Sequence, residues 1–375
     1  MQNINKLEFL FVLLVIILFC FYLIFKNSFW EFFIVPISNY NLDFTDLRCI
    51  KSWERLYIDY SNLKEVYNDN LGCKLNYPKI WIFFSKFFLK DNFLYPYILL
   101  NFIIYSSIFF YLIKTYKTKF LLYFYVSGSS MLLLERGNVE ILIFILIFLF
   151  LISKNFLKIL FLSLSVMLKI FPFFSIISQL NKKNVKVFIS CLILSILYFV
   201  YSFTELNFIF ENTPSTGDIS YGTKAITSNL EKHYNFYLNN YILSGIFLIS
   251  TVIFYKLFFY NHLSEIRYKN EEMFLAGGGI YAATFLLNSN HDYRLVFLIF
   301  LIPLIVNLEA KIIKYIFFIS IFLSLELNRL IYFLGFYGGI INTFFKIILF
   351  FLVSLILLDI FIKKFINNEL FIKNN

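Results

Sequence analysis

Charged residues are scarce in this sequence. Only 15% of its 375 residues are Asp, Glu, Lys or Arg, whereas 60% are hydrophobic and 53 are Phe. Apolar runs recur from one end of the chain to the other, which excludes an ordinary soluble domain with a charged surface. The composition predicts an all-α, polytopic integral membrane protein.

Histidine and cysteine are also few, with three and four residues. The His are scattered and no Cys spacing resembles a metal site, so we expect no metal. The chain also lacks a Walker loop, a GxGxxG motif and a nucleophile elbow, so we expect no cofactor. Gly277-Gly278-Gly279 lies inside an apolar run, where it favours close helix packing over phosphate binding.

The apolar runs predict about ten transmembrane helices in one polytopic domain, residues 1–375. The run Phe9–Phe25 is followed by no small-residue cleavage site, which is typical of a retained signal-anchor helix. The predicted crossings are Leu7–Phe25, Asn92–Ile113, Phe120–Leu134, Val139–Ser153, Val187–Phe203, Tyr241–Tyr260, Met273–Leu287, Tyr293–Asn307, Ile312–Leu325 and Ile341–Ile362.

One further run, Ile159–Leu180, contains Lys169 and Pro172. Proline breaks the helical hydrogen-bond ladder, and a charge at membrane depth needs a polar partner. We therefore predict a re-entrant hairpin with Lys169 near its tip. With both termini in the cytoplasm, this topology places the whole net charge of +10 on the cytoplasmic side, as the positive-inside rule favours. Topology thus explains the positive charge, and we expect no nucleic-acid partner.

Two long polar segments remain on the non-cytoplasmic side, residues 26–91 and residues 204–240. The end of the first, Tyr77–Lys90, mixes aromatic residues with Lys and predicts an interfacial helix. Cys49 and Cys73 lie in the same segment and are able to pair in an oxidising compartment, although nothing in the sequence fixes their separation.

Several predicted crossings are short. The runs on either side of Glu135-Arg136-Gly137-Asn138 have about fifteen residues each, or roughly 22 Å of α-helix. A hydrocarbon core is about 30 Å thick. The same holds for the runs flanking Asn288–Asp292, so we expect these polar tips to be sunk below the outer surface, around a recessed cavity. Local thinning of the bilayer is the alternative.

The candidate site combines these tips with the first polar segment. Carboxylates can accept a proton from an attacking hydroxyl, and Arg or Lys can hold a phosphate. Each residue also has an ordinary explanation: loop carboxylates are often solvated, Arg often snorkels to headgroups, and Glu135 with Arg136 makes a local ion pair. The candidates are Asp43, Asp46, Arg48, Glu135, Arg136, Asn138, Lys169, Asn290, His291, Asp292 and Arg294.

The ordered set of segments resembles the GT-C membrane glycosyltransferases, in particular glycosyltransferase family 87. The resemblance implies a GT-C-like fold and sugar transfer from a polyprenyl-phosphate donor. It also implies that Asp46, or less favourably Asp43, is the catalytic base. One departure is Lys79, which stands where family members commonly carry a second Pro. The matching segments are Phe44–Arg48, Asn76–Trp81, Glu135–Asn138, Leu168–Pro172 and Asn290–Arg294, before an apolar run ending in Pro303.

The expected function is therefore a membrane glycosyltransferase with its active site on the non-cytoplasmic side of the cell inner (plasma) membrane. Its partners would be the lipid-linked sugar donor, a glycan or lipid acceptor and membrane lipids. Two other readings stay open: a polysaccharide polymerase or ligase, and a transporter or flippase for lipid-linked glycans. A transporter is expected to show repeat symmetry and ionisable groups at mid-depth.

Overall fold

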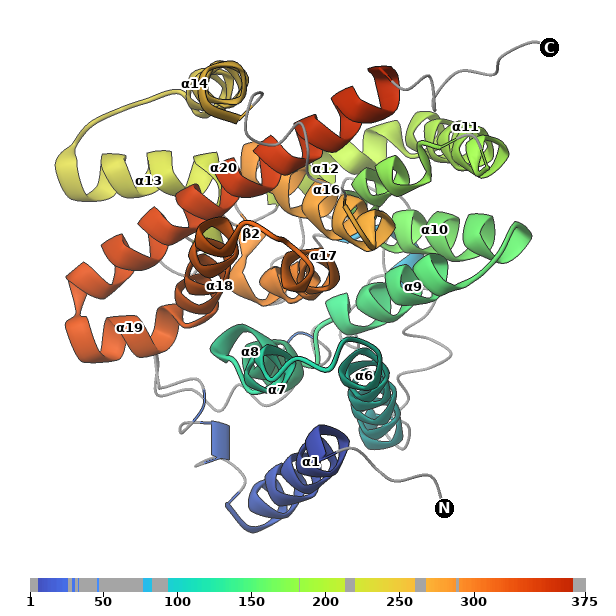
Figure 1. The fold of residues 1–375 in the computed structure, drawn as a ribbon, viewed down its shortest axis with the longest axis vertical. Coiled ribbons are helices and arrows are strands. Elements are labelled where there is room, and N and C mark those ends of the chain that lie inside the picture. The colour runs from blue at the N-terminus through green and yellow to red at the C-terminus, as the bar shows by residue number, and fades with distance from the viewer. Residues whose placement is uncertain are drawn as a thin grey trace, which may run out of the picture. The chain divides into compact units, whose positions relative to one another are not determined.

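The described part of the chain is almost entirely helical (Figure 1). Four of its helices are long and apolar enough to cross a membrane, or five if the bent pair α11–α12 counts as one span. The chain is therefore an all-α membrane protein. The computed structural model describes residues 6–25, 29–30, 33, 46, 77–82, 94–181, 183–212, 220–259, 268–287 and 290–366.

The chain forms two compact units. Unit 1 comprises Met1–Tyr125, Met131–Phe173 and Ile189–Pro214, and unit 2 comprises Val126–Ser130, Phe174–Phe188 and Ser215–Asn375. The single domain expected from the sequence stays a prediction.

Unit 1 is built from helices packed through aromatic side chains. The ring of Tyr125 lies 5.0 Å from that of Phe11 and 5.1 Å from that of Phe109, and its hydroxyl is 2.8 Å from Ser106 Oγ. These contacts hold α1, α6 and α7 together. The elements are α1 (Lys6–Phe25), α6 (Leu94–Tyr116), α7 (Phe120–Tyr125), α9 (Glu140–Ile152), α10 (Phe156–Leu168) and α12 (Phe203–Asn212), with parts of α8 (Gly128–Arg136), η2 (Phe171–Gln179) and α11 (Val185–Tyr201).

Unit 2 surrounds α16 (Glu271–Leu287) with other helices and a two-stranded antiparallel ladder. Strand β1 (Ser220–Tyr221) pairs with β2 (Asn290–His291), with Ser220 opposite His291 and Tyr221 opposite Asn290. The other elements are α13 (Thr223–Tyr234), α14 (Asn240–Phe254), the π-turn η3 (Tyr255–Phe259), η4 (Asp292–Leu301), α17 (Ile302–Val306), α18 (Lys311–Leu325), α19 (Leu327–Leu334) and α20 (Phe336–Ile366).

The three glycines of α16 allow neighbouring elements to approach closely. A Cβ atom on Gly277 would lie 2.7 Å from the Phe297 carbonyl oxygen in η4, and one on Gly279 would lie 2.5 Å from the Phe174 carbonyl oxygen in η2. Both distances are too short for a side chain. The prediction that these glycines serve close packing is confirmed.

Two predicted crossings have a different form. The run Phe120–Leu134 divides into α7 and α8, with a break next to Gly128. The run Tyr293–Asn307 consists of the 3₁₀ helix η4 followed by α17. A 3₁₀ helix rises about 2.0 Å per residue instead of 1.5 Å, so the length estimated for this run as an α-helix was too short. The interruption at Lys169 is present, because α10 ends at Leu168 and η2 begins at Phe171.

The prediction of polar loops was also incomplete. The segment Thr204–Asn240 contains most of α12, strand β1 and all of α13 within its described residues, so it is largely helical. Helix α11 bends by 76° into α12. The last predicted crossing begins earlier, at Phe336, and follows the unexpected helix α19. Within the first polar segment, the described residues 77–82 include a short helical turn.

Candidate functional site

The turn between α8 and α9 is the centre of the candidate site in unit 1. Gly137 has φ of +57°, and the Gly137 and Asn138 amides donate to the carbonyl oxygens of Leu134 (3.1 Å) and Leu133 (3.4 Å). This pattern is a Schellman motif, which ends a helix with glycine in the left-handed conformation. Asn138 precedes α9, and its Oδ1 accepts a hydrogen bond at 2.9 Å from the amide of Glu140, the first residue of that helix.

Asp46 lies against this turn. Its Oδ2 accepts a hydrogen bond from Asn138 Nδ2, and its Oδ1 lies 3.9 Å from Arg136 Nη1. Because the Asn138 oxygen is held by α9, its amide nitrogen is directed at the carboxylate. The Asp46 side chain is 25% exposed, so a solute can reach it. The Arg136 Nε also lies 3.3 Å from Glu135 Oε2, which confirms the predicted local ion pair.

Lys169 has a partner that the sequence analysis did not identify. Its Nζ lies 2.5 Å from Oε1 of Glu140, whose side chain is fully buried. The ammonium group also lies 4.2 Å from the centre of the Tyr77 ring, within range of a cation–π interaction. Glu140 was not predicted as this partner because it is a lone carboxylate at the start of an apolar run, two residues after Asn138.

The environment of Asp46 changes its acidity. Burial raises the pKa of Asp46 above the usual value of an Asp, since removal from water disfavours the charged form. Arg136 and the Asn138 hydrogen bond oppose this shift, Glu140 adds to it, and Lys169 opposes it. The net upward direction makes the Asp46 carboxylate a stronger base than an exposed Asp, which suits a group that accepts a proton.

The segment 77–82 is fixed at two points beside this cluster. Trp81 Nε1 donates to the Leu168 carbonyl oxygen at 2.9 Å, at the end of α10. The Lys79 amide donates to Glu205 in α12. These contacts hold the Tyr77 ring over the Lys169 ammonium group.

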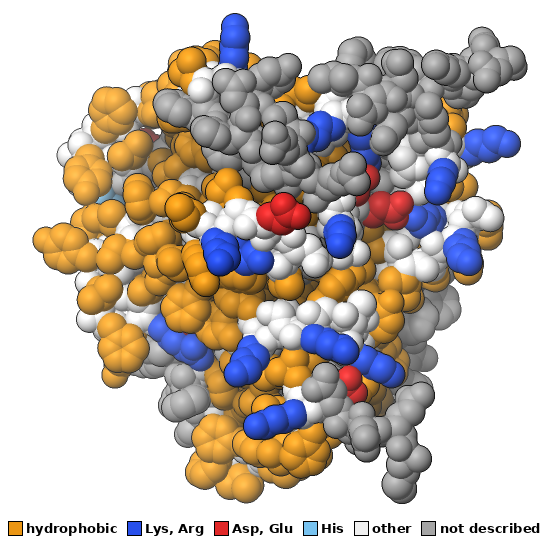
Figure 2. Space-filling view, in the orientation of Figure 1, with side chains coloured by type: hydrophobic (Ala, Val, Ile, Leu, Met, Phe, Trp, Pro, Cys, Tyr) orange, Lys and Arg blue, Asp and Glu red, His pale blue; other side chains and the backbone are white. Residues whose placement is uncertain are grey.

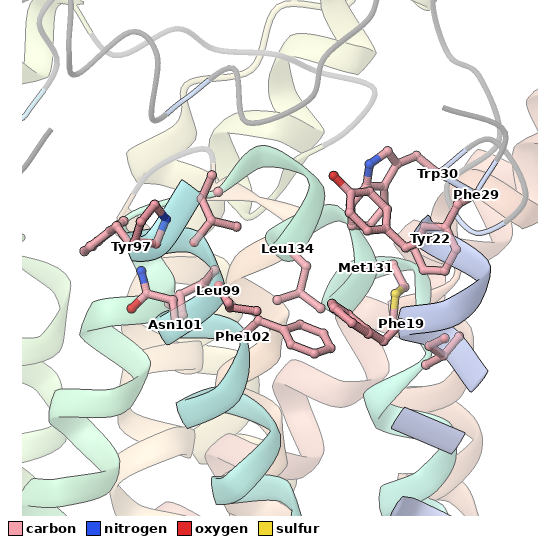
Figure 3. A pocket seen from close by; sticks show the side chains of 15 residues that line it. Phe19, Tyr22, Phe29, Trp30, Tyr97, Leu99, Asn101, Phe102, Met131 and Leu134 are labelled. Atoms are coloured by element: carbon pink, nitrogen blue, oxygen red, sulfur yellow. The ribbon is translucent and has the colours of Figure 1, made fainter. Parts of the chain in front are cut away.

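An apolar pocket borders the same turn. Its volume is about 440 Å³, within the range typical of small-molecule sites. Figure 3 shows Leu134 and Phe102 between Tyr97 and Asn101 on one side and Tyr22 and Trp30 on the other. The lining residues come from α1, residues 29–30, α6, α8, the α8–α9 turn and α9: Leu18, Phe19, Tyr22, Phe29, Trp30, Pro96, Tyr97, Ile98, Leu99, Asn101, Phe102, Met131, Leu134, Gly137 and Ile141.

The other predicted site residues lie in unit 2. Asn290 Oδ1 accepts from Arg294, and Asn290 Nδ2 donates to the Thr284 carbonyl oxygen at 2.5 Å. The ring of His291 stacks on that of Tyr293, with centroids 5.2 Å apart. The structure thus brings Asn290 and Arg294 together at the β2–η4 turn.

Asp292 is buried against Lys346 in the middle of unit 2. Its Oδ1 lies 2.6 Å from Lys346 Nζ, and the two side chains are only 5% and 3% exposed. The Lys346 carbonyl oxygen accepts from Tyr281 at 2.8 Å. Lys346 was not predicted from the sequence, because it lies ten residues into a long apolar helix and 54 positions from Asp292.

Some predictions fall outside the described residues. Asp43, Arg48, Cys49 and Cys73 are among these, so the second candidate base and the disulfide stay predictions. Among the residues that the structure describes, no three His, Cys, Asp or Glu side chains form a group able to hold a metal ion.

Comparison with other proteins gives no relative. No family model, curated protein or solved structure matches the chain.

Proposed function

We propose that unit 1 carries the active site of a glycosyltransferase that uses a polyprenyl-phosphate sugar. The acceptor hydroxyl attacks the anomeric carbon of the sugar and gives its proton to Asp46. The new bond forms between acceptor oxygen and anomeric carbon, while the bond from that carbon to the phosphate oxygen breaks. The electron pair leaves with the polyprenyl phosphate, so atoms and charge balance.

The observation that carries this proposal is the position of Asp46. The carboxylate is held by Asn138 and Arg136 at a helix–helix turn, under the influence of Lys169. A base and two cations thus occupy one cluster. Arg136 and Lys169 are suited to stabilise the negative charge that develops on the leaving phosphate.

The pocket supports a lipid-linked substrate. Its walls are largely apolar and aromatic, and Leu134, Gly137 and Ile141 line it on both sides of the turn that bears Arg136 and Asn138. An amphiphile is the class of molecule that matches an apolar pocket directly beside a charged cluster. The hydrocarbon chain of the donor would occupy the pocket while its phosphate lies at the cations.

The proposed site faces the non-cytoplasmic side of the cell inner membrane. The proposed topology keeps ten crossings and the re-entrant hairpin. The four long helices make four of these crossings, and shorter helices make the others. Cysteine-accessibility labelling should find positions near Asp218 outside and positions near Lys183 and Lys269 inside. Labelling of Lys183 and Asp218 positions from one side would refute the hairpin.

The direct experiment is transfer by purified protein from a radiolabelled polyprenyl-phosphate sugar, with envelope glycans of a deletion strain as the cellular readout. A general base contributes about 10²–10⁴-fold to the rate, so Asp46→Asn should lose most activity while still inserting in the membrane. Glu231→Gln, at an exposed carboxylate of α13, is the matched control and should keep full activity. Near-normal transfer by Asp46→Asn would refute the assigned base.

A transporter of lipid-linked glycans is the second candidate function. The buried Asp292–Lys346 pair favours it, because ionisable groups within membrane helices often belong to transport pathways. The two functions differ in a detergent solution without compartments. A transferase consumes the donor there, whereas a transporter leaves it chemically unchanged.

A further inference from the structure

Two exposed aromatic tips stand out in unit 2. One is the end of α13 with the following residues, where Tyr237 is 76% exposed. The other is the corner between α19 and α20, where Phe333 and Tyr337 are 75% and 72% exposed. The exposed large side chains are Tyr234, Phe236, Tyr237 and Tyr241 in the first tip and Tyr332, Phe333, Leu334, Phe336 and Tyr337 in the second.

The fold makes the second tip sharp. Gly335 has φ of +56° and separates α19 from α20. A Cβ atom on Gly338 would lie 2.1 Å from the Leu330 carbonyl oxygen, so the two helices approach closely. The tight corner turns five large apolar side chains outward instead of into the core.

The two tips belong to one surface, which we call the aromatic collar. The ring of His233 in α13 lies 5.4 Å from that of Phe336 at the start of α20. Hydrophobic side chains gather on the left of Figure 2, where Figure 1 places α13 and α19. An apolar surface of this kind normally marks a protein or membrane partner.

The collar lies at one end of the membrane span α20, which starts at Phe336. Helix α14 crosses the later part of α20, where Phe247 contacts Phe350 at a ring distance of 5.6 Å and Tyr255 donates to Asp359 at 3.0 Å (Figure 1). Beside the middle of α20, α14 carries an exposed apolar stripe. The stripe consists of Ile242, Ile246, Ile249 and Ile253.

The opposite end of α20 is basic. Lys363 and Lys364 occupy its last turn. Lysine near the ends of membrane helices favours the cytoplasmic side, while Tyr and Trp concentrate at membrane–water interfaces. The collar therefore has the chemistry of an interface and lies at the end of α20 that is away from these lysines.

We infer that the aromatic collar is a lipid-binding surface in the headgroup region of the non-cytoplasmic leaflet. Tyrosine suits that position because its ring enters the apolar boundary while its hydroxyl stays hydrated. The last turn of α13 lies along the interface, with Glu231 and Lys232 exposed beside the rings. The collar also fixes the entry side of α20.

The test measures depth with a fluorescent label on single cysteines in vesicles of phosphatidylethanolamine and phosphatidylglycerol. Tyr237→Cys and Phe333→Cys report on the collar, Ile249→Cys on the middle of the stripe and Lys232→Cys on the polar flank. Collar labels should lose more fluorescence to a shallow lipid-borne quencher than to a deep one. The Ile249→Cys label should show the reverse, and the Lys232→Cys label should respond to aqueous iodide.

The inference would be overturned if iodide quenched both collar labels as strongly as the label at Lys232→Cys. It would also be overturned if the two collar cysteines were modified from opposite sides of the membrane. The background replaces the four native cysteines with serine. If this cysteine-free variant does not fold, a benzophenone-bearing residue is placed at position 237 or 333 of the otherwise native chain. Its photo-crosslinks then identify what lies against Tyr237 and Phe333. Crosslinks to lipid support the surface, and crosslinks only to a second copy of the chain refute it.

Discussion

Replacing Lys346 with Met tests the buried ion pair in unit 2. The Nζ–Oδ1 distance to Asp292 is 2.6 Å, and both side chains are almost completely buried. With an effective dielectric constant near 20, the Coulomb attraction is about 6 kcal/mol, part of which offsets the cost of removing both charges from water. Removing one partner of such a pair typically costs about 3–5 kcal/mol, because the other charge stays buried and uncompensated. We expect Lys346→Met to lower the free energy of unfolding by about this amount.

The double variant Lys346→Met/Asp292→Asn separates this cause from lost packing. With both charges removed, most of the stability should return, because a neutral pair does not carry the desolvation cost of a lone carboxylate. Lys363→Met on the same helix is the control. Lys363 is 25% exposed, and its buried partner Asp359 keeps the hydrogen bonds that it accepts from Tyr255 and Tyr268, so we expect a smaller loss than for Lys346→Met.

The assay is reversible unfolding of the purified protein in mixed micelles, followed by helical circular dichroism. Equal losses for Lys346→Met and Lys363→Met would refute the reasoning. So would a double variant no more stable than Lys346→Met alone.

Three further predictions concern the site and the core. The raised pKa keeps Asp46 protonated at pH values where an exposed Asp is already ionised. The value of kcat/KM for transfer should therefore fall as pH drops through a pKa above the usual Asp value. A pH–rate profile checks this: the native protein should show the fall at low pH, and Asp46→Asn should not. Glu140→Gln should destabilise the fold because it removes the carboxylate that pairs with Lys169. The double variant Glu140→Gln/Lys169→Met should recover thermal stability but not transfer. Full transfer by the double variant would contradict the role of Lys169. Gly279→Ala should lower the free energy of unfolding by about 1–3 kcal/mol, because the new methyl group overpacks against backbone. Gly245→Ala in α14 should raise it by up to about 1 kcal/mol through helix propensity, because a Cβ atom there has nothing within 4 Å. Unfolding in micelles compares the two variants, and equal effects would contradict the close packing at Gly279.

The sequence predicted those features that depend on local chemistry. Helix α1, the break at Lys169 and the turn at Glu135–Asn138 follow from apolar runs, a proline and a glycine. The need of Lys169 for a polar partner was also predictable, because a charge in an apolar run is costly when unpaired. Its identity was not, since Glu140 is 29 positions away.

The features that sequence missed depend on non-local contacts or on weak periodicity. Asp292 and Lys346 are 54 positions apart, and nothing in either segment identifies the other. In η4, residues 295–301 are all apolar, so no polar face distinguishes a 3₁₀ helix from an α-helix. The break between α7 and α8 lies beside Ser127-Gly128-Ser129-Ser130. Small residues of this kind also occur inside membrane helices, where they allow close packing, so they did not identify the break.

The geometry of the proposed base depends finally on one glycine. Gly137 has φ of +57°, a conformation that costs a residue with a Cβ atom about 1–2 kcal/mol, while Asn tolerates it better. Gly137→Ala should therefore lower the free energy of unfolding by about that amount, and Gly137→Asn by less. The same turn directs the Asn138 amide toward Asp46, so relaxing it would also separate the carboxylate from its donor. Unfolding in micelles ranks the two variants. If Gly137→Ala is as stable as Gly137→Asn, the left-handed turn does not hold Asn138, and another contact must fix the position of Asp46.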